Sequence, residues 1–315
     1  MNFSALLNII ITLFLLMICG YVCRKLGILD NTASKNLSKL IITVGQPMMI
    51  IGALNDAAYT KENLKIALST TLIGFALHVV MGTAAFLICR KIKNVNQAKL
   101  IEFGLVFTNC GFLGFPILDS IYGGGMGSFM GAFYVISFHI FLWTWGIAIL
   151  ARGRDDIKLT PKKALINYGT IPCAIGVLLY LLKPVLQMPQ SVGKFFSYLG
   201  GLCTPVSVLI TGGLLATISL GSMFRNRKLY YMSFLKLLVF PIVTCVLAKL
   251  CGLRDIYVTL CTVVAGLPCA STVVMLAELH DIEPAYASQT VGMTSLLTTA
   301  TLPCVVLFAK WIISL

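Results

Sequence analysis

Charged residues are scarce in this sequence of 315 residues. Only 11% of the residues are charged, against about 25% in a typical soluble domain, and 58% are hydrophobic. A soluble chain of this composition would have too little polar surface to cover its core. The composition therefore excludes an ordinary soluble domain and indicates an integral membrane protein, for which lipid replaces water as the solvent of the apolar faces.

Several motifs that carry chemistry are missing as well. The sequence has no GxxxxGK[ST] phosphate-binding loop, no HExxH zinc motif and no GxSxG nucleophile motif, which argues against an ATP-driven pump and against an enzyme. Its 11 cysteines form no CxxC pair and lie near no histidine that would complete a zinc site. No basic block alternates with aromatic residues. We therefore expect no catalytic residues, no metal, no cofactor and no nucleic-acid partner.

What the sequence does contain is long apolar runs. A helix needs roughly 20 apolar residues to cross about 30 Å of hydrocarbon. The runs fall near residues 3–22, 37–54, 64–89, 100–121, 128–150, 164–182, 195–219, 229–250, 256–279 and 285–313. The first lacks the basic start and the cleavage site of a signal peptide, so we interpret it as a retained span. The pattern predicts an all-α integral membrane protein with ten transmembrane helices.

The basic residues predict an orientation for these spans. Of the 24 Lys and Arg residues, 16 fall in loops on one side and seven on the other, and Lys236 lies inside a span. Cytoplasmic loops carry the excess of Lys and Arg, so we expect both termini to lie on the outer side of the cell membrane. The net charge of +13 then reflects membrane topology. Two turns into its span, Lys236 is expected to extend its ammonium to the cytoplasmic surface.

The basic loop 152–163 divides the chain into two halves of five spans, 1–151 and 164–315. Because five is odd, the second half must enter the membrane from the opposite side, and two similar halves would form an inverted repeat, as in many secondary transporters. Pro47 and Pro205 lie in the second span of each half, and Pro116 and Pro268 in the fourth. Their similar offsets favour such a repeat.

Proline and glycine together predict breaks in the fourth and ninth spans. Proline removes a backbone donor and clashes with the carbonyl four residues earlier, so we expect breaks near Gly114–Pro116 and Gly266–Pro268. Freed peptide groups in a membrane must be buried in protein or line a cavity. Helix N-termini that begin there would form an anion site at the midplane. The alternative interpretation is that both are ordinary proline kinks that only shape packing.

Polar residues beside these breaks are the candidate binding residues. The Asn109 amide precedes the first break, Ser271 and Thr272 follow the second, and Gln46 lies beside Pro47 in the second span. Ionisable residues within spans are candidates for ion coupling, because burying them in hydrocarbon is costly. These are His78, His139 and Glu102. Each histidine has the alternative role of a hydrogen-bonded packing residue, and Glu102 that of an interfacial carboxylate.

These residues resemble the auxin efflux carrier family, which includes plant auxin carriers and bacterial malate and malonate permeases. The resemblance covers essentially the whole chain. It rests on Asn109 followed by Gly114 and Pro116, on Leu267-Pro268, Ala277 and Pro303, and on the spans of Pro47 and Pro205. The short 152–163 loop is similar to that of the bacterial members. Cys269-Ala270 follows Pro268 where the plant carriers have Gln-Gly, and Glu278 replaces a lysine.

The resemblance implies a fold of two inverted five-helix repeats, with spans 4 and 9 crossing at the midplane. It implies a scaffold of spans 1, 2, 6 and 7 that can form a homodimer, and an organic anion held near the crossing. By this resemblance Asn109 contacts the substrate carboxylate. The substrate-binding residues that we expect are Asn109, Gly114, Pro116, Gly266, Pro268, Ser271, Thr272 and Gln46.

The sequence thus predicts a carrier of small mono- or dicarboxylates that works by alternating access. We expect glycines 114 and 266 to let the backbones approach, and the helix ends after Pro116 and Pro268 to supply positive potential. Few buried cations are expected, which favours a substrate with one or two charges. Proton coupling, sodium coupling and uncoupled movement remain open, as does the direction of transport. The alternative from another class is a membrane sensor that binds a metabolite without moving it.

Overall fold

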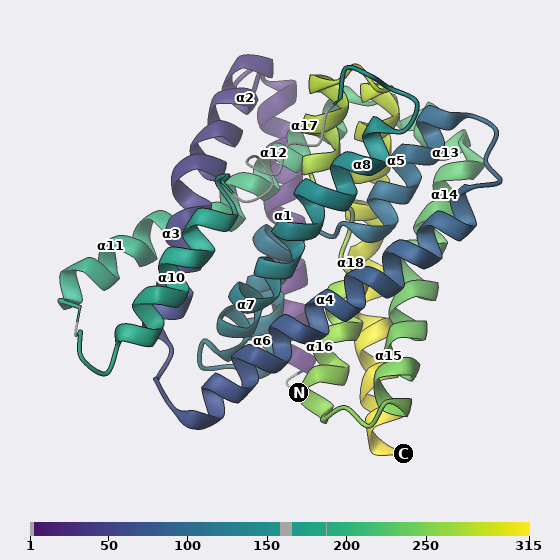
Figure 1. Cartoon of the computed structure of the whole chain (residues 1–315). Coiled ribbons are helices and arrows are strands. Elements are labelled where there is room, and N and C mark those ends of the chain that lie inside the picture. Colours follow the sequence, from purple (N-terminus) through teal and green to yellow (C-terminus); the bar gives the residue numbers. More distant parts are fainter. Residues whose placement is uncertain (1–2, 158–165, 187) are drawn as a thin grey trace.

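The computed structural model describes residues 3–157, 166–186 and 188–315, and in these ranges it is built from helices (Figure 1). They are α1 (Phe3–Lys25), α2 (Asn31–Leu40), η1 (Ile41–Gly45), α3 (Gln46–Asp56), α4 (Lys61–Cys89), α5 (Val95–Val106), η2 (Cys110–Gly114), α6 (Phe115–Tyr122), α7 (Met126–Phe141), η3 (Leu142–Gly146), α8 (Ile147–Ala151), α10 (Thr170–Leu182), α11 (Gln190–Gly201), α12 (Cys203–Thr217), α13 (Leu220–Arg225), α14 (Arg227–Phe234), η4 (Leu235–Val239), α15 (Phe240–Leu250), α16 (Asp255–Gly266), α17 (Thr272–Leu279) and α18 (Pro284–Ser314). The η elements are single turns of π-helix.

Seven helical stretches are long and apolar enough to cross a membrane, judged by length and composition. They are Phe3–Lys25, Asn31–Asp56, Lys61–Cys89, Met126–Ala151, Gln190–Thr217, Arg227–Leu250 and Pro284–Ser314. Shorter apolar helices occupy Cys110–Tyr122, Thr170–Leu182 and Asp255–Gly266. The long helices confirm the predicted multi-pass membrane protein.

α1 shows how these residues make a lipid-facing helix. One side of it is buried, and the opposite side exposes large apolar residues at a spacing of three or four. The buried residues are Leu6, Ile10, Leu13 and Met17, and the exposed ones are Leu7, Ile11, Leu15 and Ile18. Apolar side chains on both faces are stable when one face packs on protein and the other on lipid.

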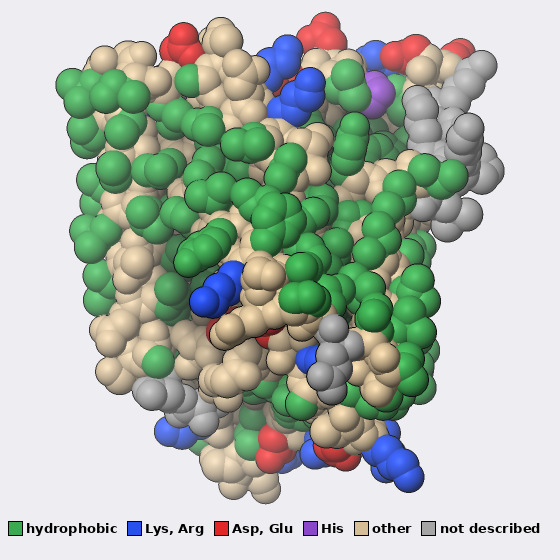
Figure 2. All heavy atoms as spheres, turned by 90° about the vertical axis from the view of Figure 1, so that its left-hand side faces the viewer, with side chains coloured by type: hydrophobic (Ala, Val, Ile, Leu, Met, Phe, Trp, Pro, Cys, Tyr) green, Lys and Arg blue, Asp and Glu red, His purple; other side chains and the backbone are tan. Residues whose placement is uncertain are grey.

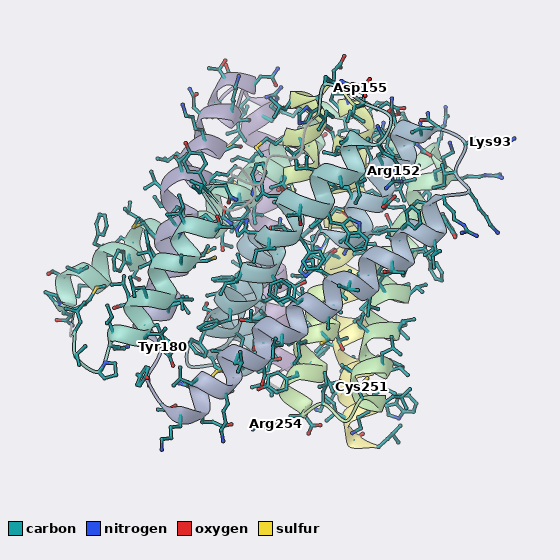
Figure 3. All side chains as sticks on the ribbon, in the orientation of Figure 1. Lys93, Arg152, Asp155, Tyr180, Cys251 and Arg254 are labelled. Atoms are coloured by element: carbon teal, nitrogen blue, oxygen red, sulfur yellow. The ribbon has the colours of Figure 1, made fainter. Side chains whose placement is uncertain are left out.

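The surface of the molecule has the same character. Figure 2 shows hydrophobic side chains across the middle of the face formed by the left-hand side of Figure 1, with most acidic and basic side chains at its upper and lower ends. Both termini lie at the lower end in Figure 1. Lys93, Arg152 and Asp155 lie at the opposite end, and Arg254 and Cys251 lie at the end of the termini (Figure 3).

Short polar turns begin several of the helices. Asp30 accepts a hydrogen bond from the amide of Ala33, and Thr60 caps α4 in the same way. Asn94 accepts from the amide of Gln97 at the start of α5. Such caps satisfy amides that have no partner inside the helix, which is why Asp, Asn and Thr mark these starts in the sequence.

Three of the π-turns have an identifiable cause in the sequence. η1, η2 and η4 each end two residues before a proline, namely Pro47, Pro116 and Pro241. Proline cannot donate to the carbonyl four residues earlier and its ring clashes with it. A wider π-turn relieves that clash while the helix continues. The carbonyl of Phe112, four residues before Pro116, accepts a hydrogen bond from Thr204 Oγ1 at 2.8 Å.

The helices pack in a few extensive pairs. α1 lies along α12, α4 along α7, and α15 along α16, while α3 contacts both α10 and α11. Glycines make the α1–α12 contact close: an added Cβ at Gly20 would collide with the backbone of Leu209, and one at Gly212 with that of Met17. The η2–α6 helix packs against this pair and against α7, so α1 and α12 form one wall beside the site described next.

Candidate functional site

Two non-helical segments lie at the centre of the candidate site. The first break, residues 107–109, separates α5 from η2, and the second break, residues 267–271, separates α16 from α17. They pair as an isolated antiparallel bridge between Thr108 and Cys269. The Asn109 amide donates to the Pro268 carbonyl at 2.9 Å, and the Ala270 amide donates to the Phe107 carbonyl at 3.0 Å. Each break thus satisfies peptide groups that the other has freed, as an apolar environment demands.

The first break does not lie where proline and glycine predict it. We expected the interruption near Gly114–Pro116, but these residues are helical, and the helix that follows the break begins at Cys110. Pro116 is accommodated by the π-turn of η2. The helix N-terminus at the site is therefore headed by Asn109, and the expectation that it follows Pro116 is wrong. In the ninth span α16 ends at Gly266 and Pro268 lies inside the second break.

Glycines allow the two paired segments to approach, although only one of the two expected glycines is needed for this. An added Cβ at Gly114 would lie 3.2 Å from Leu267 Cδ1, so glycine allows a close approach to the second break. At Gly266 it would meet only ordinary contacts, with none closer than 3.4 Å. Gly104 of α5 is tighter: its Cβ would lie 2.9 Å from Cys269 Sγ and 2.6 Å from Met232 Cε. Sequence reasoning missed Gly104.

Polar groups without protein partners remain beside the breaks. Asn109 is only 5% exposed, and its side-chain amide forms no hydrogen bond within the part of the chain that the structure describes. The hydroxyls of Ser271 and Thr272, at the start of α17, are buried and likewise lack a partner among the described residues. Buried polar groups are normally paired, so these three are available to a bound ligand. Amide and hydroxyl donors suit a carboxylate.

Gln46 reaches the same helix start from α3. Its Nε2 lies 3.3 Å from Nε2 of His139 on α7, and an added Cβ at Gly111 would lie 3.7 Å from Gln46 Nε2. Both side chains are buried. The structure therefore brings together Gln46 and His139, which the sequence suggested separately, beside the first turn of η2.

The other two candidate coupling residues lie apart from this pair. His78 Nδ1 bonds to the Gly74 carbonyl of its own helix at 2.7 Å, and the ring stacks between Tyr134 and Phe141. Glu102 is fully buried, and both of its carboxylate oxygens accept from Arg152 at 2.8 and 2.9 Å. Glu102 is thus a buried carboxylate with an arginine partner that is partly exposed.

The position of the Lys236 side chain differs most from what the sequence predicts. We expected its ammonium to reach the cytoplasmic surface, but the side chain is fully buried, with 0% exposure. Nζ donates to the carbonyl of Leu105, at the end of α5, at 3.0 Å. Lys99 is also buried and donates to the carbonyl of Leu150 at 3.1 Å. The expectation of few buried cations thus has exceptions at Lys99 and Lys236, whose ammonium groups are solvated by helix-end carbonyls in place of water.

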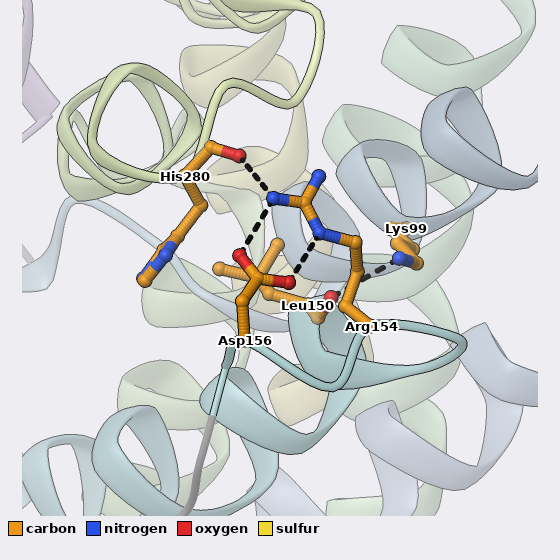
Figure 4. A network of polar contacts seen from close by, with 5 residues as sticks. All are labelled: Lys99, Leu150, Arg154, Asp156 and His280. Carbon is orange, nitrogen blue, oxygen red and sulfur yellow. Dashed lines mark hydrogen bonds and ion pairs between the residues drawn. The ribbon is translucent and has the colours of Figure 1, made fainter.

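A network of polar contacts joins residues that follow α8 to a residue that follows α17 (Figure 4). Arg154 donates through two nitrogens to the carboxylate of Asp156 and through Nη2 to the carbonyl of His280, just after α17. The hydrogen bond from Arg154 lowers the pKa of Asp156 to about 2. Lys99 and its Leu150 partner lie beside them. The network attaches the segment after α8 to the end of α17.

A small cavity lies between α1, η2–α6, α12 and α18. Its volume is about 40 Å³, and its lining includes Leu113, Thr211, Ser295 and Thr298. Ligand sites for small molecules usually measure about 300–1,000 Å³, so this cavity admits a few waters at most. The Ser295 hydroxyl is buried there without a partner among the described residues.

Comparisons with known proteins identify relatives of this chain. The family model described as membrane transport protein matches residues 5–306. An uncharacterized transporter of Methanothermobacter thermautotrophicus is 22% identical over 96% of this chain and 98% of that protein. The uncharacterized transporter MJ1031 of Methanocaldococcus jannaschii is 21% identical over 92% and 94%, and YfdV of Escherichia coli K12 is 20% identical over 93% and 95%. These matches confirm the family resemblance expected from the sequence. The chain therefore belongs to the membrane transport protein family, that of the auxin efflux carriers, and is a multi-pass membrane transporter.

Proposed function

We propose that this transporter moves small organic anions, mono- or dicarboxylates, by alternating access around the two paired breaks. The observation that carries the proposal is the side-chain amide of Asn109, which is nearly buried and forms no hydrogen bond within the described residues. It stands at the N-terminal end of a 13-residue helix, Cys110–Tyr122, where the helix dipole attracts negative charge. A carboxylate there would accept from Asn109 and from the hydroxyls of Ser271 and Thr272.

The architecture that goes with this function is a ten-span inverted repeat. In it, residues 1–151 and 164–315 are the two repeats and 152–163 the cytoplasmic connection, of which 158–163 lie outside the described residues. Spans 4 and 9 cross at the bilayer midplane. The termini face outward from the plasma membrane, which is supported by their position at the end opposite Lys93 and Arg152 (Figures 1 and 3). The scaffold of spans 1, 2, 6 and 7 is proposed to form a homodimer.

Alternating access requires the contacts between the proposed scaffold and the proposed moving part to break and re-form. Side-chain hydrogen bonds between described residues of the proposed scaffold and the proposed moving part include those of Thr204 with the Phe112 carbonyl and of Gln46 with His139. Both are single hydrogen bonds, each worth about 1 kcal/mol net, so they can break and re-form during transport. The α1–α12 glycine contact has no such freedom, which supports its assignment to the scaffold.

The test is transport by the purified protein in proteoliposomes. We would screen malate, malonate, succinate, lactate, 2-oxo acids and aromatic acids, and compare the wild type with Asn109→Ala at equal reconstitution. The expected result is saturable flux of one acid that the variant loses. Specific binding of an acid without flux would instead indicate the membrane sensor. Failure of every acid to bind or move, with the protein folded, would contradict the carboxylate site.

A further inference from the structure

We propose that Lys236 is a tethered cation at the crossing, which takes the place of a coupling sodium ion and balances the charge of the bound anion. The inference rests on the proposed function, because it concerns the same site and names its charge balance. It makes transport by this protein independent of sodium. Neither the sequence pattern nor the family relationship assigns this role to Lys236.

The first support is the position of the ammonium. Leu105, its hydrogen-bond partner, is the penultimate residue of α5 and lies two residues before the first break. The last carbonyls of a helix have no partner within the helix and carry the negative end of its dipole. In transporters with broken helices, such half-helix ends and unwound carbonyls are where coupling sodium ions or protons bind. Here the Lys236 ammonium occupies that end.

The chain is shaped to deliver the lysine there. Lys236 lies in the π-turn η4, which precedes Pro241 and packs against α5, α16 and α18. Such turns are frequent at functional sites. The π-turn before Pro241 thus contains a lysine whose side chain is directed inward.

The second support is the missing counter-charge. Lys236 has no acidic partner among residues 3–157, 166–186 and 188–315, where the ion pairs join Arg152, Arg154 and Arg254 to Glu102, Asp156 and Glu62. The titratable groups that interact with it are the thiols of Cys110 and Cys269 and the imidazole of His78. A buried ammonium without a counter-ion is costly, so an arriving carboxylate would be drawn to it.

A metal site built from side chains is not seen in the described ranges. No group of three or more His, Cys, Asp or Glu side chains is placed there to hold a metal ion. A sodium site at the crossing would have to rely on carbonyls, and the ammonium already uses the Leu105 carbonyl. One fixed positive charge balances one carboxylate at Asn109 without a second ion, so a monocarboxylate would be neutralised and a dicarboxylate would keep one negative charge.

Lys99 provides a matched control. It too is buried, and it too donates to a carbonyl near a helix end, that of Leu150 in α8. Its ammonium lies near Arg154 (Figure 4), and Lys99 itself is eight residues before the first break. Lys99→Ala removes the same charge from a comparable setting without opening the crossing.

The experiment compares wild type, Lys236→Ala and Lys99→Ala in sodium chloride and in choline chloride. The first measurement is the thermal unfolding midpoint of each detergent-purified protein, which needs no substrate. The second is uptake of the acid identified in the proteoliposome screen. Adding n-butylammonium chloride tests whether an external ammonium replaces the missing side chain.

We expect the wild type and Lys99→Ala to show the same midpoint and the same uptake in both salts. Lys236→Ala should lose uptake at least tenfold in choline, and sodium or butylammonium should raise its midpoint and restore part of its uptake. Sodium-stimulated uptake or sodium stabilisation of the wild type would overturn the inference without any variant. A folded Lys236→Ala protein that transports normally in choline, or that responds to neither cation, would overturn it too. If no acid is transported by the wild type, the proposed function fails, while the midpoints still decide the role of Lys236.

Discussion

The backbone amide of Asn109 donates to the carbonyl of Pro268, so the main chain of each break is held by the other. Because the main chain makes this contact, the Asn109 side chain is left free for a different partner. The same residue thus joins two distant parts of the sequence through its backbone and presents an open amide through its side chain.

Asn109→Ala is expected to impair binding without destabilising the protein. The side-chain amide makes no hydrogen bond within the described residues, so its removal costs little stability. A hydrogen bond to a charged group is worth about 1.5–3 kcal/mol, so the affinity for the acid should fall about 10- to 100-fold. Uptake at subsaturating acid and the thermal midpoint would be measured together. Asn109→Asp, which adds a like charge, should be more severely impaired; equal uptake by all three proteins would remove Asn109 from the site.

Gly104 and Gly266 should respond differently to alanine. At Gly104 the new Cβ would press on Cys269 Sγ, on the second break, and on Met232 Cε. Overpacking of this kind costs about 1–3 kcal/mol. At Gly266 the Cβ would meet only ordinary contacts, so Gly266→Ala should change stability by less than about 0.5 kcal/mol. Denaturation in detergent micelles checks both, and the opposite ranking would contradict the packing described for the crossing.

The Arg152–Glu102 pair predicts an asymmetric double-mutant cycle. Arg152→Ala leaves a fully buried carboxylate without its partner and should cost about 2 kcal/mol, less than a wholly buried pair because the Arg152 side chain is 40% exposed. Glu102→Gln added to that variant removes the uncompensated charge, so the double variant should be more stable than Arg152→Ala alone. A double variant less stable than the single one would show that the charge is compensated by other groups.

Asp156 gives a prediction for pH. Its pKa is lowered from 3.8 to about 2 by the hydrogen bond from Arg154, so the folded state favours the carboxylate. A depressed pKa contributes stability above the ordinary value of 3.8, and that contribution is lost as the pH falls towards 2. The difference in unfolding midpoint between wild type and Asp156→Asn should therefore be constant from pH 5 to 8 and shrink below about pH 4. A difference that changes between pH 6 and 8 would assign it to another group.

The long membrane helices could be predicted from the sequence because lipid imposes a simple rule on them. A face in contact with lipid must be largely apolar, and α1 shows this rule as a long, predominantly hydrophobic run. Helix starts at Asp30, Thr60 and Asn94 were readable for a similar reason, since an N-cap depends only on its neighbours.

The first break could not be located by local signals. Phe107, Thr108 and Asn109 include neither proline nor glycine, and their non-helical conformation depends on hydrogen bonds to the second break. Pro116 does carry the local signal for a break, but the π-turn η2 accommodates it and the helix continues. At the second break the proline signal and the break coincide, because Pro268 lies within the paired segment.

The candidate site was only partly visible for the same reason. Asn109, Ser271 and Thr272 were identified from their position beside proline and glycine, and their hydroxyl and amide groups are indeed without partners in the described structure. Lys236 was misjudged, because its depth in the span allows either direction. Which way its side chain points is decided by η4 and by the carbonyl of Leu105, neither of which a hydropathy pattern reveals.

The pairing of the breaks also bears on how the protein is made. Residues 107–109 leave the ribosome long before residues 267–271, so the amide of Asn109 has no Pro268 carbonyl to bind while the first spans enter the bilayer. Until the ninth span arrives, this segment must stay hydrated, remain within the insertion machinery or form a regular helix. The pairing of the two breaks is therefore a late event in biogenesis. A chain that is interrupted before residue 268 carries unpaired backbone groups that membrane quality control can recognise.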